Sequence, residues 1–116
     1  MKRLTLITLL LAALLVACGP STPAAVSGKM TLWHGWTGAE AETLKTTIDK
    51  FKAANAGVTV DVLAVPFDQL QNKFTTEAST GGGPDLLIGP KDWIGGFAKA
   101  KLTAALDDLA KDILAD

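Results

Sequence analysis

The sequence predicts an α/β fold in which a parallel sheet is covered by helices. After residue 28, short apolar runs rich in β-branched residues alternate with longer segments of helical period, in the order β-α-β-α-β-α. Strands separated by helices in this way pair in parallel, because each crossover returns the chain to the same end of the sheet. The length allows one small domain at most, and the chain contains no internal repeat.

A strand followed by an amphipathic helix opens the pattern. Met30–Trp33 is a short apolar run closed by glycine, as suits a buried strand. The spacing of Thr37 and Glu40 matches a capping box, which predicts that a helix begins here under a threonine cap. The apolar face of this helix is predicted at Leu44, Ile48 and Phe51. The Asn-Ala-Gly sequence at 55–57 is expected to end it in the usual C-terminal manner.

A second strand and helix follow directly. Residues 58–65 are rich in valine, which favours a pleated surface, and Pro66 is expected to end the strand. The helical period returns from about Asp68 to Ser79, with an apolar face at Leu70, Phe74 and Ala78. The Thr-Gly-Gly-Gly-Pro sequence at 80–84 predicts a turn. It is not predicted to bind phosphate, because it precedes a strand and no Gly-Lys-Ser/Thr follows it.

The third strand and helix bring a second aromatic segment to the same end of the sheet. Residues 85–89 suit a strand, and a helix marked by Trp93, Ile94 and Phe97 is expected to begin near Pro90 or Lys91. Ligands of parallel sheets bind beyond the carboxyl ends of the strands. The segments after the first and third strands therefore become the candidates for a binding site.

Both candidate segments combine indole rings with glycine and short polar side chains. Residues 33–38 read Trp-His-Gly-Trp-Thr-Gly, and residues 89–93 read Gly-Pro-Lys-Asp-Trp. An aromatic face offers a sugar ring a flat apolar platform, and a carboxylate accepts hydrogen bonds from its hydroxyls. The chemistry of the two segments is therefore the chemistry that carbohydrate binding requires.

Several of these residues also suit structural roles. Trp33 lies within the strand and is expected in the core, whereas Trp36 follows it in a glycine-flanked turn and is expected to be exposed. His34, the only histidine, has no metal-ligand partners at suitable spacing, so we expect a strand-end residue and no metal. Asp85 is expected to be structural, facing the strand entry. Asp92 suits the first turn of a helix, a place compatible with sugar binding.

Charge and motifs argue against nucleic-acid binding and against catalysis. Without Lys2 and Arg3 the chain has nine basic and twelve acidic residues, a net charge of −3. It lacks the basic stripe that nucleic acid requires. It also lacks a nucleophile elbow, a Ser-His-Asp order and paired carboxylates in the two segments. We therefore expect a binding protein that is not an enzyme and needs no cofactor.

Residues 1–17 are predicted to be a lipoprotein signal peptide. Two basic residues precede the apolar stretch Leu4–Val16, which is shorter than the ~20 residues of a transmembrane helix. Small residues flank Cys18, which is expected to become the lipidated first residue of the exported chain; an ordinary signal peptide cut elsewhere is the alternative. As the only cysteine, it forms no disulfide within the chain. Residues 18–28 are expected to be a flexible tether.

Three stretches of this sequence carry a family resemblance. Residues 29–38, the amphipathic helix to Phe51, and above all residues 83–97, from Gly-Pro-Asp to Gly-Gly-Phe, resemble the beginning of an extracellular solute-binding protein of ABC sugar importers, most like the maltose and maltodextrin branch. The resemblance covers residues 29–116. It implies a periplasmic-binding-protein-like fold of type II, of which this chain would be a fragment holding part of the N-terminal lobe.

The resemblance also implies a function and a set of binding residues. By position, Trp36, Thr37 and Gly38 correspond to the first ligand-contacting loop, Asp92 corresponds to an aspartate that bonds sugar hydroxyls, and Trp93 lies beside it. The implied protein is a monomer, lipid-anchored at the periplasmic or extracellular face, that delivers oligosaccharide to the transmembrane subunits of an ABC permease. No nucleic acid is implied as a partner.

The sequence departs from the enteric maltose-binding pattern in ways that keep the exact ligand open. That pattern has an arginine at position 93, an aromatic residue at position 89 and an Asp-Lys pair in the first loop. The resemblance therefore implies the sugar class rather than maltose itself. A binder of glycerol 3-phosphate or another polyol on the same fold is the alternative, and a secreted hydrolase is a more distant one.

Overall fold

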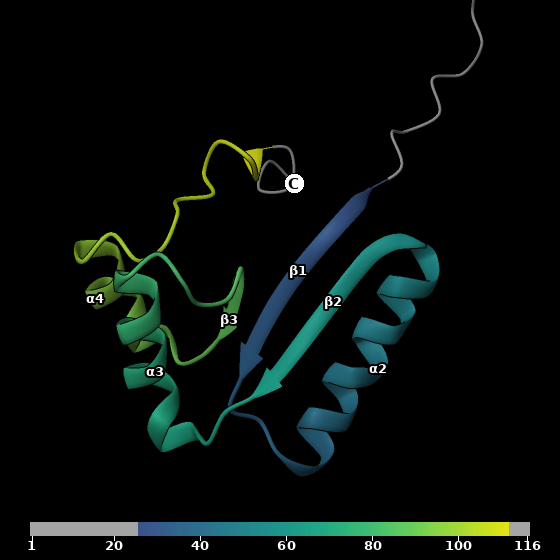
Figure 1. Ribbon diagram of the computed structural model, residues 1–116, viewed down its shortest axis with the longest axis horizontal. Coiled ribbons are helices and arrows are strands. Elements are labelled where there is room, and N and C mark those ends of the chain that lie inside the picture. The colour runs from purple at the N-terminus through teal and green to yellow at the C-terminus, as the bar shows by residue number, and fades with distance from the viewer. Residues whose placement is uncertain (1–25, 112–116) are drawn as a thin grey trace, which may run out of the picture.

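The protein forms a three-stranded parallel sheet with helices on both faces (Figure 1). The computed structural model describes residues 26–111, so the predicted signal peptide, Cys18 and most of the predicted tether lie outside the described residues. The elements are β1 (Ser27–His34), α2 (Gly38–Ala54), β2 (Gly57–Ala64), α3 (Phe67–Ser79), β3 (Leu86–Ile88), the 3₁₀ helix η2 (Lys91–Trp93) and α4 (Ile94–Lys99). The predicted order and the parallel sheet are confirmed.

The central strand of the sheet is β1. It pairs in parallel with β2 from Ser27 to His34 and with β3 over its last three residues, which gives the order β2-β1-β3. His34 lies opposite Ala64 on one side and Ile88 on the other. The three strands therefore end together, and each connection to the next helix leaves from the same edge.

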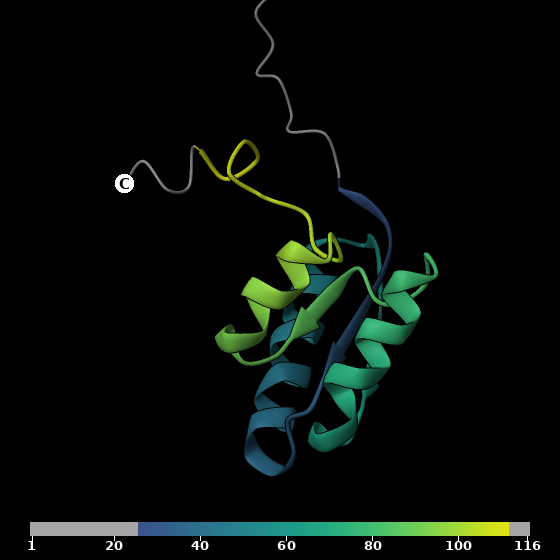
Figure 2. The ribbon, with the colours of Figure 1, turned by 90° about the vertical axis from the view of Figure 1, so that its left-hand side faces the viewer.

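The core has two halves, one on each face of the sheet. Figures 1 and 2 show α2 on one face, with α3 and α4 on the other. The α2 half contains Leu32, Leu44 and Val60, with Met30, Ile48, Val58 and Ile88 packed around them. The opposite half contains Trp33, Val65, Leu70, Phe74 and Phe97, with Ala78, Leu87, Trp93 and Leu102 around them. Because neighbouring strand residues point to opposite faces, Leu32 and Trp33 serve different halves.

The beginning of α2 and its apolar face differ from the sequence predictions. Thr37 is the N-cap residue, but its side chain makes no capping hydrogen bond. The chain enters the helix through Gly38 at a φ of +55°, which is not the geometry that a capping box requires. Phe51, predicted on the buried face, is 42% exposed. The last turns of α2 lie along the amino ends of the strands, where β1 itself is exposed.

The end of α2 lies where the sequence predicts it, and only the part played by Gly57 differs. The helix ends at Ala54 with Asn55 as its C-cap, and Gly57 is the first residue of β2. Gly57 is needed for a close approach of two strands, since a Cβ at this position would lie 2.8 Å from the Cβ of Ser27. Glycine is therefore required at position 57, but for the packing of β2 against β1 and not for the end of the helix.

The turn and the last helix follow the predictions with shifted boundaries. Gly81 and Gly83 have φ values of +82° and +92°, so the predicted turn at 80–84 is confirmed. The predicted third helix begins at Lys91 as one 3₁₀ turn and continues as α4. Among residues 26–111, no helix is long and apolar enough to span a membrane.

Candidate functional site

Three connections line the carboxyl edge of the sheet. Residues 35–37 join β1 to α2, residues 65–66 join β2 to α3, and residues 89–90 join β3 to η2. The sequence singled out the first and third of these for their indoles. Since the strand ends lie in register, all three connections contribute to one surface.

Trp36 provides an exposed aromatic face in the first connection. Its side chain is 40% exposed, as predicted, and borders a shallow hollow of about 310 Å³ lined also by Ala39, Glu40 and Thr43. The sequence assigned Glu40 to a capping box, whereas the structure places this residue in the lining of the same hollow as Trp36. An aromatic platform with a carboxylate next to it can stack a sugar ring and accept hydrogen bonds from its hydroxyls.

Thr37 and Gly38 lie beside this hollow at the start of α2, and both are exposed. The Thr37 hydroxyl makes no capping bond, which leaves it able to bond a ligand. A Cβ at Gly38 would meet nothing within 4 Å, so it is the backbone conformation, and not a close neighbour, that requires glycine there. Their predicted contact with ligand stays a prediction.

The third connection carries Asp92 and Trp93 in η2. Asp92 is exposed, whereas Trp93 is half-buried and its ring packs against Phe67 and Phe97, with centroid separations of 5.7 and 6.1 Å. Gly89 makes room for this indole, because a Cβ there would lie 2.9 Å from the ring. Trp93 therefore contributes to the core, and its role in ligand binding stays a prediction, as does that of Asp92.

Phe67 links the first and third connections and was not singled out from the sequence. It is the first residue of α3 and is 57% exposed. A Cβ at Gly35 would lie 3.1 Å from its ring, and the ring of Trp93 lies on it as well. The available signal was its position directly after the second strand, at the same edge as the two tryptophan segments. We add Phe67 and Glu40 to the candidate binding residues.

Asp85 lies at the other end of β3 and is structural, as predicted. Its carboxylate accepts hydrogen bonds from the backbone N–H and the hydroxyl of Thr31, both at 2.8 Å. These two bonds, the backbone one first, hold the pKa of Asp85 below its ordinary value. Asp85 therefore ties the start of β3 to β1 rather than facing the candidate site.

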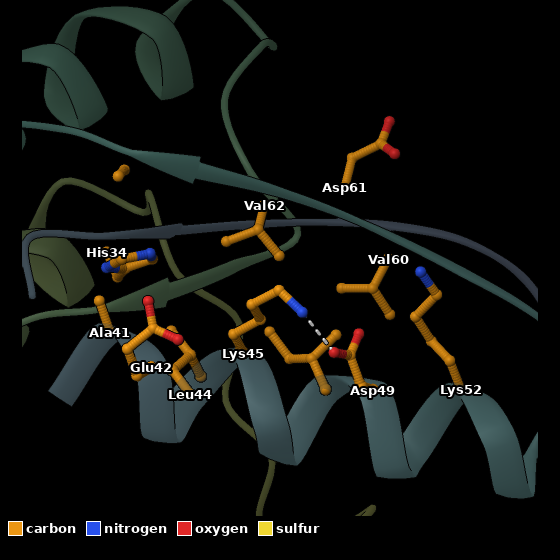
Figure 3. Close-up of a pocket in the computed structure, with 12 residues that line it drawn as sticks. His34, Ala41, Glu42, Leu44, Lys45, Asp49, Lys52, Val60, Asp61 and Val62 are labelled. Atoms are coloured by element: carbon orange, nitrogen blue, oxygen red, sulfur yellow. Dashed lines mark hydrogen bonds and ion pairs between the residues drawn. The ribbon is translucent and has the colours of Figure 1, made fainter. Parts of the chain in front are cut away.

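Another hollow begins at the ends of β1 and β2 and runs away from this edge. It has a volume of about 550 Å³ and lies along the flank between α2 and β2 (Figure 3). The ion pair between Lys45 and Asp49, at 2.6 Å, lies along it, and His34 lies at one end. It contains none of the five predicted binding residues. No three His, Cys, Asp or Glu side chains within residues 26–111 form a group that could hold a metal.

The sequence is similar to a family of known proteins over most of its length. Residues 35–116 match the family described as bacterial extracellular solute-binding protein. The maltotriose-binding protein of Pyrococcus abyssi is 32% identical over 88 residues, which make up 76% of this chain and 19% of that protein. The chain thus spans about a fifth of the length of this relative.

Solved structures agree with the sequence comparison. The maltose/maltodextrin-binding domain from Bdellovibrio bacteriovorus bound to maltotriose superposes with a TM-score of 0.68 at 29% identity, over 71% of this chain and 21% of that chain. The cyclic alpha-maltosyl-1,6-maltose binding protein from Arthrobacter globiformis gives a TM-score of 0.64 at 25% identity, over 72% of this chain and 21% of that chain.

Proposed function

Because the chain belongs to the family of bacterial extracellular solute-binding proteins, we propose that it is part of a carbohydrate-binding protein, of maltodextrin type, that delivers sugar to an ABC permease. The observation that carries this proposal is the exposed indole of Trp36, which shares a hollow with Glu40 at the carboxyl edge of a parallel sheet. A sugar ring stacks on such a platform while its hydroxyls donate to the carboxylate.

The arrangement of the three connections suits a ligand of more than one ring. Trp36 belongs to the first connection and Asp92 to the third, with Phe67 between them. Aromatic faces that alternate with polar groups can follow successive rings of an oligosaccharide. The names of the relatives from Pyrococcus and Bdellovibrio, which mention maltotriose, support the choice of a malto-oligosaccharide as first ligand to test.

Calorimetric titration of the full-length protein tests this function. We expect heat of binding with maltotriose and a weaker response, or none, with mannotriose and sn-glycerol 3-phosphate. The phosphate compound needs cationic partners, and Lys91 is the cation that the two predicted segments offer. No response to any oligosaccharide would contradict the proposal, and binding of glycerol 3-phosphate alone would favour the polyol alternative. Shortened oligosaccharide after incubation would indicate a hydrolase.

The family indicates where the protein acts. The family is one of extracellular proteins, so the chain is an exported one. We propose further that it is a monomer held at the outer face of the membrane by lipid on Cys18, close to its permease. Metabolic labelling with a radioactive fatty acid should mark the wild type and not the Cys18→Ser variant. An unlabelled wild type would rule out the anchor.

A further inference from the structure

His34 is the only histidine of the chain, and its side chain is almost completely buried. It is the last residue of β1, with 4% of its surface exposed, and it lies on the α2 side of the sheet. Figure 3 shows its ring close to the start of α2, next to Ala41 and Glu42. His34 lies two residues before Trp36, the proposed sugar platform. Because a buried polar ring is costly without a hydrogen bond, we expect it to contact a hydrogen-bond partner.

That contact is a hydrogen bond to Trp36. The backbone N–H of Trp36 donates to Nδ1 of His34 at 3.1 Å. An imidazole nitrogen accepts only when it carries no proton, so the ring is neutral and its proton sits on Nε2. The ring thereby provides, just beyond the end of the strand, an acceptor that the β ladder no longer supplies.

The residues around this bond are fixed from two other sides. The carbonyl oxygen of His34 accepts the N–H of Val65 at 2.9 Å, which joins the strand end to the second connection. Gly35 packs so closely on Phe67 that a Cβ would lie 3.1 Å from its ring and 3.2 Å from its Cα. The path of the chain up to Gly35 is therefore set by the second connection and by α3, and the His34 ring extends this support to Trp36.

We propose that His34 is a positioning residue, which holds the Trp36 platform in place for sugar binding. The inference rests on the proposed role of Trp36. A side chain without an acceptor at this position would leave the Trp36 N–H without this bond and the indole less firmly placed.

Two substitutions separate the hydrogen bond from the packing of the ring. In His34→Asn the side-chain oxygen can accept in place of Nδ1, whereas His34→Leu keeps the bulk and loses the acceptor. We expect His34→Leu to weaken maltotriose binding roughly threefold to tenfold at about pH 7.5, the worth of one hydrogen bond. His34→Asn should stay within about twofold of wild type there.

Opposite results would overturn the inference. Wild-type affinity in His34→Leu would show that the ring does not position Trp36, and a loss in His34→Asn as large as in His34→Leu would show that the acceptor does not support binding. Amide hydrogen exchange without sugar gives a second readout: the Trp36 N–H should exchange faster in His34→Leu than in His34→Asn. If wild type binds no sugar, the proposed function fails while this exchange measurement still decides the role of His34.

Discussion

Asp92 is an exposed carboxylate in the first turn after β3, at the carboxyl edge. If it accepts hydroxyl hydrogen bonds, its substitution removes a charged hydrogen bond from the complex. Asp92→Ala should then weaken maltotriose binding by about 1.5 to 3 kcal/mol, while the adjacent Lys91→Ala should change it little. Calorimetry on the full-length variants measures both. Equal affinity of Asp92→Ala and wild type would remove Asp92 from the site.

Asp85 should make stability depend on pH in the acid range. The hydrogen bonds from Thr31 lower its pKa in the folded state, so the unfolded chain binds more protons as the solution is acidified. The stabilisation is fully present above 3.8, the ordinary pKa of this carboxyl group. It is lost as the pH falls through the lowered pKa that Asp85 has in the folded protein. Urea midpoints measured on both sides of this window should therefore fall less in Asp85→Asn than in wild type. The matched control, Asp107→Asn, should behave as wild type.

Residue roles were predictable where they depend on position within an element. Trp33 inside a strand is buried, Trp36 after it is exposed, and Asp85 at a strand entry is structural, as the sequence predicts. Phe67 and Glu40 were missed because their importance comes from neighbours distant in sequence or from a cap that does not form. Hydrophobic period and turn chemistry do not contain that information.

The C-terminal end of α4 is a Schellman motif with an unfavourable residue. The N–H of Leu102 bonds the carbonyl of Phe97 at 2.9 Å, and the N–H of Lys101 bonds that of Ala98 at 3.0 Å. This places Lys101 at a φ of +57°, where a Cβ is strained. Lys101→Gly should raise the free energy of unfolding by about 1 kcal/mol. Denaturant titration measures it, with Lys101→Ala as the control that keeps the strain. An equal gain in stability for Lys101→Gly and Lys101→Ala would instead show that removal of the lysine charge stabilises the protein.

The elements themselves were predicted well, and their ends less well. The apolar face of α3 is buried as its period predicts, because Leu70 and Phe74 pack under both β1 and α4. The predicted buried face of α2 is wrong at Phe51, which is exposed because the nearby start of β1 is itself exposed. A helical period predicts which side of a helix faces the sheet, but not how far the sheet extends beneath it.

The molecule as a whole leaves much apolar surface uncovered. The three-stranded sheet of the described residues has β2 and β3 at its edges, and several large apolar side chains are more than 40% exposed: Val62, Leu63, Leu86, Ile94, Leu106 and Leu109. Residues 18–116 alone should therefore unfold over a broad temperature range and self-associate. Scanning calorimetry with light scattering measures both. A sharp, reversible transition above ~60 °C would contradict this expectation.

The central claim is that the carboxyl edge of the sheet binds a sugar through Trp36. The most direct test is calorimetric titration of the full-length protein with maltotriose, comparing wild type, Trp36→Ala and Phe51→Ala. Phe51 is the matched control, because it is an equally exposed aromatic residue at the other end of α2. We predict binding by wild type and Phe51→Ala, and a loss of about tenfold or more in Trp36→Ala. Undiminished affinity of Trp36→Ala would contradict the account.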